Sequence, residues 1–171
     1  MFIWHSVFGS EYFNPECRGY SPVQFSQSTR IKWQDEIGIW LNKNLPKGSA
    51  ILVTDWPGRF AYFSSMKIMS TDGLVNDYNY QKEIVDIGIV RYLKEKNIKY
   101  MIGPYEQLNY ERRLGYQVNI SKNNYEFEIY SLLKNQNAGK FILHDSDIIV
   151  KFPDIIPSSF TQKLALYKLN I

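Results

Sequence analysis

The sequence has almost no cysteine and no long hydrophobic run. Its single cysteine, Cys17, excludes an internal disulfide, because a disulfide needs two thiols. No segment reaches the roughly 18 consecutive apolar residues that a membrane-spanning helix needs, and residues 1–13 lack the basic start and long apolar middle of a signal peptide. On these grounds the chain is expected to stay where it is made. That expectation changes if the chain is a piece of a longer polypeptide.

Concentrated positive charge and familiar catalytic or cofactor motifs are also missing. The 20 basic and 17 acidic residues are interspersed and give a net charge of +3, so we predict no nucleic-acid partner, which would favour a one-sided basic face. No G-x-G-x-x-G, P-loop or G-x-S-x-G pattern occurs, and "DGLVND" does not fit the spacing of an EF-hand. We therefore predict no cofactor, no metal and no catalytic residue in this chain.

Apolar and aromatic residues, in contrast, are plentiful. Hydrophobic residues make up 44% of the 171 residues and aromatic residues 16%, which is enough for one domain with a proper core, packed largely ring against ring. Residues 1–27 mix glycine, proline, serine and aromatic residues without a period, and we interpret them as an irregular lead-in or linker. We predict a single α/β domain over residues 28–171.

The first half of that domain alternates helical and strand patterns. Apolar residues recur at helical spacing from Thr29 to Leu45, and Pro46 and Gly48 end the pattern. The apolar run Ala50–Thr54 then predicts a strand covered on both faces, as in a parallel sheet. We predict further strands in "KIMST" and "IKYMIGP", a short helix in "RFAYFSS", and one longer helix from about residue 80 to residue 96.

The order of these elements predicts the fold class. Helix, strand, helix, strand, helix and strand follow one another over residues 28–104, which is typical of an α/β protein. We predict a small Rossmann-like three-layer domain with a mainly parallel sheet, whose third strand ends at Gly103 and Pro104. Residues 105–171 are mostly β: "YEFEIYSL" and part of "DIIVKFP" alternate with period two, and "LALYKL" follows. These antiparallel strands either extend the sheet's edge or form a companion sheet.

Two loops follow predicted parallel strands and carry polar side chains. Ligands of open parallel sheets bind beyond the carboxyl ends of the strands, so the loops "TDWPGR" and "STDGLVND" place five residues as candidate ligands of a polar molecule or cation. These candidates are Asp55, Arg59, Asp72, Asn76 and Asp77. The alternative is local: the acids and the amide cap the following helices, and a glycine takes a turn conformation. We favour the local interpretation, because such residues are common at these positions for local reasons alone.

The histidines and the cysteine give weaker signals. His144, Asp145 and Asp147 in "LHDSD" suggest a metal site, but one histidine beside acids in a predicted turn is more often a solvated loop. His5 is distant in the sequence, and no histidine lies near Cys17 in the sequence to activate a thiol nucleophile. We therefore predict no metal site and no nucleophile from these residues.

The middle of the chain resembles a known family. Over about residues 30–104 it contains "WQDEIGIWLNKNLPKGSAILVTDWPGRFAYFSSMKIMSTDGLVND" and "IVRYLKEKNIKYMIGP", and it is similar to the soluble extracytoplasmic domain that follows the membrane helices of many bacterial GT-C class glycosyltransferases. Those integral membrane enzymes use polyprenyl-phosphate sugars. The matching positions are Ala50 to Val53, Gly58, Ala61, Tyr62, Phe63, Ile68, Met69, Asp72, Gly73, Leu74, Tyr100, Met101 and Ile102.

The resemblance implies a non-catalytic extracytoplasmic accessory domain, tethered to the membrane through its parent enzyme. Its partners would be the transmembrane part of that parent and a lipid-linked sugar or acceptor. The family's catalytic carboxylates lie in loops between transmembrane helices, and no positions of this chain match them. One alternative is a free-standing α/β ligand-binding protein or enzyme with a site between the Asp55 and Asp72 loops. Another is a structural interaction module with a tyrosine-rich surface.

Overall fold

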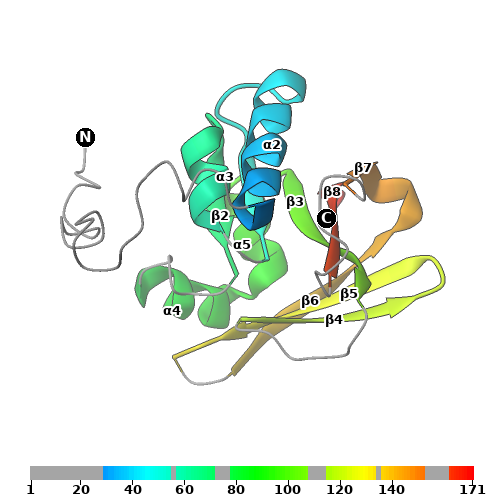
Figure 1. The fold of residues 1–171 in the computed structure, drawn as a ribbon. Coiled ribbons are helices and arrows are strands. Elements are labelled where there is room, and N and C mark those ends of the chain that lie inside the picture. Colours follow the sequence, from blue (N-terminus) through cyan, green and yellow to red (C-terminus); the bar gives the residue numbers. More distant parts are fainter. Residues whose placement is uncertain (1–28, 55–56, 72–77, 108–114, 134–135, 153–161) are drawn as a thin grey trace, which may run out of the picture.

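The computed structural model describes residues 29–54, 57–71, 78–107, 115–133, 136–152 and 162–171 (Figure 1). Within these residues the protein is mixed α/β, with four α-helices, a five-stranded sheet and a three-stranded antiparallel sheet. The helices are α2 (Thr29–Asn44), α3 (Pro57–Phe63), α4 (Tyr78–Ile87) and α5 (Ile89–Glu95). In the same part of the chain, each helix falls short of the length and apolarity that crossing a bilayer requires.

The large sheet is mixed. Its strands lie in the order β2 (Lys67–Ser70), β1 (Ala50–Val53), β3 (Tyr100–Gln107), β8 (Gln162–Lys168) and β7 (Ile148–Lys151). β1 pairs in parallel with β2 and β3, whereas β8 pairs antiparallel with β3 and with β7. Parallel pairing is therefore confined to the three strands of the first half, and the sheet as a whole is mixed rather than mainly parallel.

The small sheet accounts for the other late strands. It has the order β4 (Tyr116–Ser121), β5 (Asn124–Ser131) and β6 (Gln136–His144), joined as consecutive antiparallel pairs. A short 3-10 helix over Asp145–Asp147 leads from β6 into β7. Both alternatives for residues 105–171 are thus realised, because β7 and β8 extend the large sheet while β4, β5 and β6 form a companion sheet.

Alternate residues of the central strands face opposite sides of the large sheet. Leu52 and Met101 belong to one buried cluster, whereas Ile51, Val53 and Ile102 belong to another. All five side chains are fully buried. The prediction that the run beginning at residue 50 is a strand covered on both faces is therefore confirmed, and the continuous apolar run is its cause.

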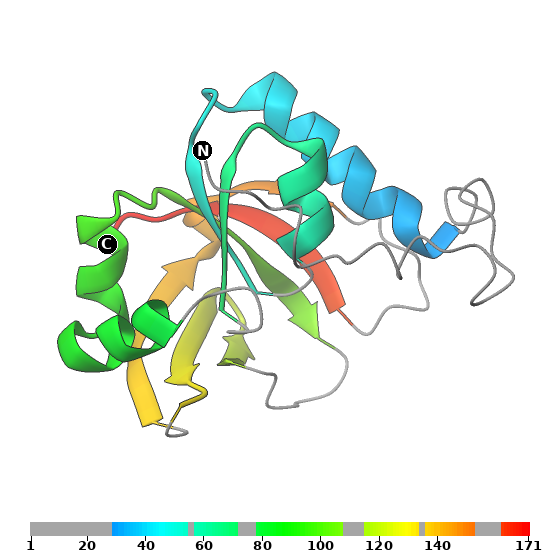
Figure 2. The same ribbon diagram turned by 90° about the vertical axis from the view of Figure 1, so that its left-hand side faces the viewer.

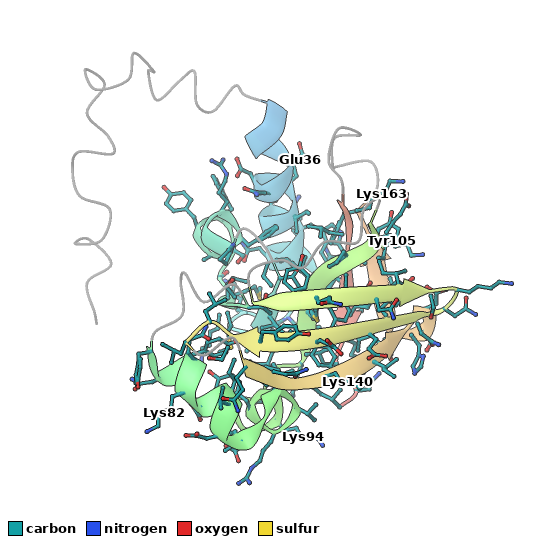
Figure 3. The ribbon with its side chains drawn as sticks, turned by 90° about the horizontal axis from the view of Figure 1, so that it is seen from below. Glu36, Lys82, Lys94, Tyr105, Lys140 and Lys163 are labelled. Atoms are coloured by element: carbon teal, nitrogen blue, oxygen red, sulfur yellow. The ribbon has the colours of Figure 1, made fainter. Side chains whose placement is uncertain are left out.

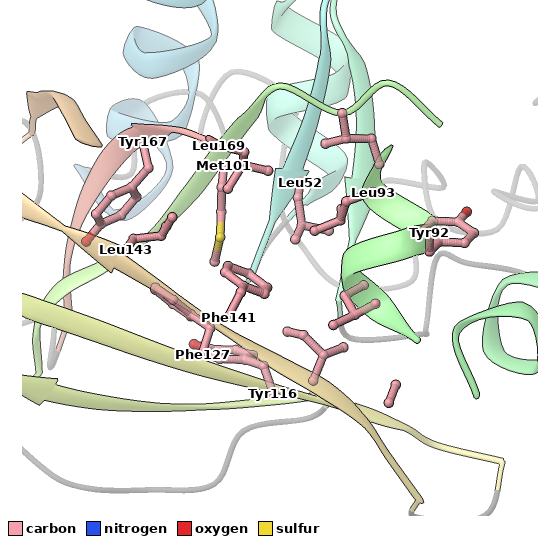
Figure 4. Packing of buried hydrophobic residues seen from close by; sticks show 14 of the residues in the cluster. Leu52, Tyr92, Leu93, Met101, Tyr116, Phe127, Phe141, Leu143, Tyr167 and Leu169 are labelled. Carbon is pink, nitrogen blue, oxygen red and sulfur yellow. The ribbon is translucent and has the colours of Figure 1, made fainter. Parts of the chain in front are cut away.

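Helices and the small sheet cover these two faces. On one face, α2 and α3 bring in Ile37, Leu41 and Phe60, and both views place these helices together on that side (Figures 1 and 2). On the other face, the small sheet packs with α4 and α5, and Met101 points towards the rings of Phe127 and Phe141 (Figure 4). The protein thus has three layers with the large sheet in the middle.

The third strand continues through Gly103 and Pro104, so the prediction that it ends there is wrong. β1 pairs with β3 only as far as Val53 opposite Ile102, so Pro104 lies beyond β1 and its missing N–H is not needed there. A Cβ on Gly103 would lie 2.9 Å from Met101 Cε in the same strand and 3.2 Å from Phe127 Cε1 of β5. Glycine therefore lets β3 approach the neighbouring side chains closely.

The predicted long helix over residues 80–96 is also wrong, because it is broken in two. Gly88 separates α4 from α5 with φ 80° and ψ 150°, a conformation that side-chain-bearing residues rarely adopt. The Gly88 N–H donates to Ile84 O at 3.1 Å, and the Gly88 carbonyl accepts from Tyr92 N at 3.0 Å. Both helices therefore join at Gly88 through hydrogen bonds while their axes differ in direction (Figure 2).

Candidate functional site

The first candidate site lies at the carboxyl ends of β1 and β2. These strands pair in parallel from Ala50 opposite Lys67 to Val53 opposite Ser70. The two strands therefore end at the same edge of the sheet, and Thr54 and Thr71 follow directly after them. Four of the candidate ligand residues, Asp55, Asp72, Asn76 and Asp77, lie outside the described residues. Of the predicted set, the structure describes Arg59.

Two buried threonines stabilise the edge at which β1 and β2 end. Thr54 N donates to Ile102 O at 3.1 Å, and Thr71 N donates to Val53 O at 3.0 Å, which continues the sheet's hydrogen bonding one residue past each strand. The Thr71 hydroxyl also donates to the Thr54 carbonyl at 3.0 Å. Both threonines are buried. They therefore hold the strand ends together, and the Thr71 hydroxyl is committed to the backbone.

Arg59 is committed to a structural ion pair. Its Nε and Nη2 donate to the two carboxylate oxygens of Asp35 at 2.7 and 2.6 Å, a bidentate arrangement that joins α3 to α2. The guanidinium carbon also lies 5.3 Å from the centre of the Phe63 ring. Since Asp35 already balances its charge, Arg59 has a complete structural role without a ligand. The sequence offered no signal for Asp35, which lies 24 positions away.

The side chains of the "LHDSD" turn make hydrogen bonds to several different residues. The Asp147 carboxylate accepts from His144 N at 2.9 Å and from Asn170 Nδ2 at 2.8 Å, while the His144 ring nitrogen Nδ1 lies 2.7 Å from Asn124 Oδ1. Asp145 instead accepts from a tyrosine hydroxyl of β5. Over the residues that the structure describes, no group of three or more histidine, cysteine or acidic side chains is positioned to hold a metal.

Asp145 belongs to a tyrosine cluster between the two sheets. Tyr125 OH donates to Asp145 Oδ1 at 2.6 Å, and the Tyr125 ring lies 5.4 Å from the Tyr167 ring, edge to face. Burial, followed by the Asp145 hydrogen bond, raises the pKa of Tyr125 to about 12. Burial also raises the pKa of Tyr167, whose hydroxyl donates to Pro104 O at 3.0 Å. Both phenols are therefore neutral, structural hydrogen-bond donors.

A second candidate site, which the sequence did not reveal, is a hollow of about 430 Å³ between the α4–α5 junction and β6. Residues 87–91 and Lys94 line one side, and residues 138–140 line the other. Each charged side chain in this lining is cationic: Arg91, Lys94 and Lys140. Figure 3 shows Lys94 and Lys140 on the same side of the molecule, on α5 and β6. The only sequence signal is one glycine in each segment, in "DIGIV" and "NAGK".

Comparison with known proteins identifies the family. A family model described as a domain of unknown function (DUF8728) matches residues 22–151. The chain belongs to the DUF8728 family. No curated protein and no solved structure matches the chain. The DUF8728 match ends at residue 151, before β8, although β8 lies between β3 and β7 in the large sheet. In this chain, the folded unit therefore extends beyond the matched residues to include β8.

Proposed function

We propose that this chain is a non-catalytic extracytoplasmic accessory domain of a membrane-embedded glycosyltransferase, which binds an acceptor or a partner protein. The transmembrane part of the parent enzyme would be its permanent partner, and a lipid-linked sugar or acceptor its transient one. In this proposal the chain does no chemistry itself, and catalysis belongs to the parent.

One observation carries the proposal. The segments that resemble the glycosyltransferase-associated domain, over about residues 30–104, fold as one continuous unit from α2 to β3, with parallel strands in the order β2-β1-β3. This order of parallel strands with helices on both faces supports a Rossmann-like classification of that half. The pairing of Arg59 with Asp35 also favours a scaffold over a reactive centre.

The test is the reading frame from which the chain comes, together with the activity of the isolated chain. The proposal expects several transmembrane segments in frame upstream of residue 1, and no sugar transfer by the isolated polypeptide when polyprenyl-phosphate sugars are supplied. A complete reading frame that begins at Met1 with no membrane partner encoded nearby would contradict the proposal. So would turnover by the isolated chain.

A free-standing ligand-binding protein is the second candidate. It is favoured by the adjoining ends of β1 and β2, which Thr54 and Thr71 hold together. A thermal-shift screen with sugar phosphates, nucleotides and divalent cations tests it. This function expects a saturable increase in the midpoint that Asp72→Ala abolishes without unfolding the protein, while the control Asp86→Ala, an exposed acid on α4, leaves the increase intact. If no compound moves the midpoint, the second candidate is excluded.

A further inference from the structure

Two buried polar side chains meet where α4 packs against the end of β5. Gln81, near the start of α4, is 4% exposed, and Ser131, the last residue of β5, is fully buried. The Gln81 side chain reaches the strand end directly, because its Oε1 accepts from Leu132 N at 2.8 Å. This hydrogen bond fixes the glutamine amide beside the peptide bond that joins Ser131 to Leu132.

Ser131 faces the side of the small sheet on which α4 lies. Buried and less buried residues alternate along β5, and Ser131 comes two residues after Ile129, so both side chains face the same way. Ile129 belongs to the same buried cluster as Ile84 of α4. The Ser131 hydroxyl and the Gln81 amide therefore lie on the same side of β5, at one contact.

Two polar atoms at this contact, Gln81 Nε2 and Ser131 Oγ, are buried without a hydrogen-bond partner among the residues that the structure describes. Other buried hydroxyls are satisfied: those of Ser64 and Thr71 donate to backbone carbonyl oxygens. Buried polar atoms in proteins are nearly always paired, either with the protein or with ordered water. Leaving such an atom unpaired generally costs more free energy than immobilising one water molecule.

The orientation of the Gln81 amide restricts what can occupy the contact. Exchanging Oε1 and Nε2 would place donors against the Leu132 N–H, so a rotated amide would lose the existing hydrogen bond. Nε2 therefore needs an acceptor, whereas the Ser131 hydroxyl can donate or accept. A cation is a poor occupant, because the amide presents donors to it. A water molecule satisfies both atoms, and buried waters typically make about three hydrogen bonds.

We infer that a water molecule is bound between α4 and β5, where it accepts from Gln81 Nε2 and hydrogen-bonds to Ser131 Oγ. The water completes the polar contact that Gln81 makes with the end of β5, and so it is a structural part of the joint between the helix and the small sheet. This inference does not depend on the proposed glycosyltransferase association, since it uses only residues of α4 and β5.

Nuclear Overhauser spectroscopy between water and the ¹⁵N-labelled full chain tests the site. The side-chain amide protons of Gln81 should show a cross peak to water with the relative NOE and ROE signs of a long-lived, bound molecule. The side-chain amide of Asn42, which is exposed and donates to Phe63 O, is the internal control and should show no such peak. Absence of the Gln81 cross peak would overturn the inference.

Two substitutions of Ser131 separate a bound water from exchange through the hydroxyl proton. Ser131→Ala leaves space for the water and keeps the Gln81 donor, so the cross peak should persist. Its loss would assign the signal to the exchanging hydroxyl and overturn the inference. Ser131→Val fills the space with methyl groups and should abolish the cross peak, so persistence there would contradict a bound water. Ser64→Ala is the matched control, because its buried hydroxyl is already satisfied, and it should leave the cross peak unchanged.

A high-resolution crystal structure of the unaltered protein gives an independent answer, even if the valine variant does not fold. Electron density for an ordered water is expected at about 2.7–3.2 Å from both Gln81 Nε2 and Ser131 Oγ. Apolar side chains packed directly around Nε2, with no density for a water, would overturn the inference.

Discussion

Tyr125 illustrates how single residues tie the two sheets together. Only 5% of the residue is exposed, its ring packs on Tyr167 of the large sheet, and its hydroxyl donates to Asp145, just past β6. Burial and the neighbouring carboxylate both disfavour the ionised, negatively charged form of the phenol. This contact between the sheets therefore favours a neutral Tyr125.

This dependence predicts a pH effect for Tyr125→Phe. The folded-state pKa is about 12 against an ordinary value of 10.0, so the folded protein holds this proton more tightly than the unfolded chain. The resulting stability is complete below pH 10 and is lost as the pH rises towards 12. Tyr125→Phe should lower the free energy of unfolding by about 1–2 kcal/mol at pH 8. That difference should shrink above pH 10 in urea denaturation measured from pH 8 to pH 12.

Tyr62→Phe is the control, because 82% of Tyr62 is exposed. It should leave the free energy of unfolding unchanged over the same pH range. A constant difference between Tyr125→Phe and the unaltered protein at every pH would contradict the assigned role of the Tyr125 proton.

For single residues, the contacts of candidate side chains could not be predicted from the sequence. Its place after a strand makes Arg59 one of the candidate ligand residues, beside the favoured local interpretation, and in the structure its side chain pairs with Asp35 of another helix. The position of Arg59 after a strand can be read from the local sequence. Its pairing with Asp35, 24 positions away, depends on how α2 and α3 pack in the folded protein. For the same reason, no pattern in the sequence indicated that Arg91 and Lys140 lie beside one hollow.

Among the elements, the break between α4 and α5 best shows the limit of periodicity. Apolar residues continue at helical spacing from Val85 through Ile89 to Leu93, so the pattern predicts one helix. The periodicity of the apolar residues indicates which side chains are buried. It contains no information about the backbone torsion angles of Gly88, where the helix is interrupted. In contrast, α2, β1 and β2 were predicted close to their observed bounds, because each has a local pattern bounded by proline, glycine or polar residues. A short helix was also predicted in "RFAYFSS", but α3 begins two residues earlier, at Pro57.

Gly88→Ala tests this junction. Since alanine is strained at φ 80° and ψ 150°, the substitution should lower the free energy of unfolding by about 1–3 kcal/mol in urea denaturation. Gly58→Ala in α3 is the matched control, because no positive φ occurs there and its added Cβ would meet nothing within 4 Å. That change should be neutral or stabilising by up to about 1 kcal/mol. Equal effects of the two substitutions would show that the Gly88 conformation is not required.

On the scale of the whole molecule, β8 connects the two halves of the large sheet. It lies between β3 and β7, and Leu166 and Tyr167 are fully buried on opposite faces of the sheet. The strand therefore contributes to both layers of the core. Without it, β3 and β7 would have no connection within the sheet.

A chain that ends at residue 151, as the family match does, should therefore fail to fold cooperatively. Removal of β8 exposes both core clusters and leaves β3 unpaired on one side, which costs more than a domain's usual stability of about 5–15 kcal/mol. Thermal unfolding followed by near-ultraviolet circular dichroism should show no sharp transition. A chain ending at Asn170, which removes only the partly buried Ile171, should keep the transition. A native spectrum from the shorter chain would contradict the role assigned to β8.

The position of β8 also has a consequence for synthesis on the ribosome. Tyr167 contacts Pro104 across 63 residues of sequence, and at about 5–20 residues per second that interval takes roughly 3–13 s to translate. During those seconds one edge of β3 is unpaired in the nascent chain, and its free N–H and C=O groups are a template for pairing with other chains. Chaperones that shield nascent polypeptides would therefore have a defined target here, and slower translation before residue 162 should increase aggregation.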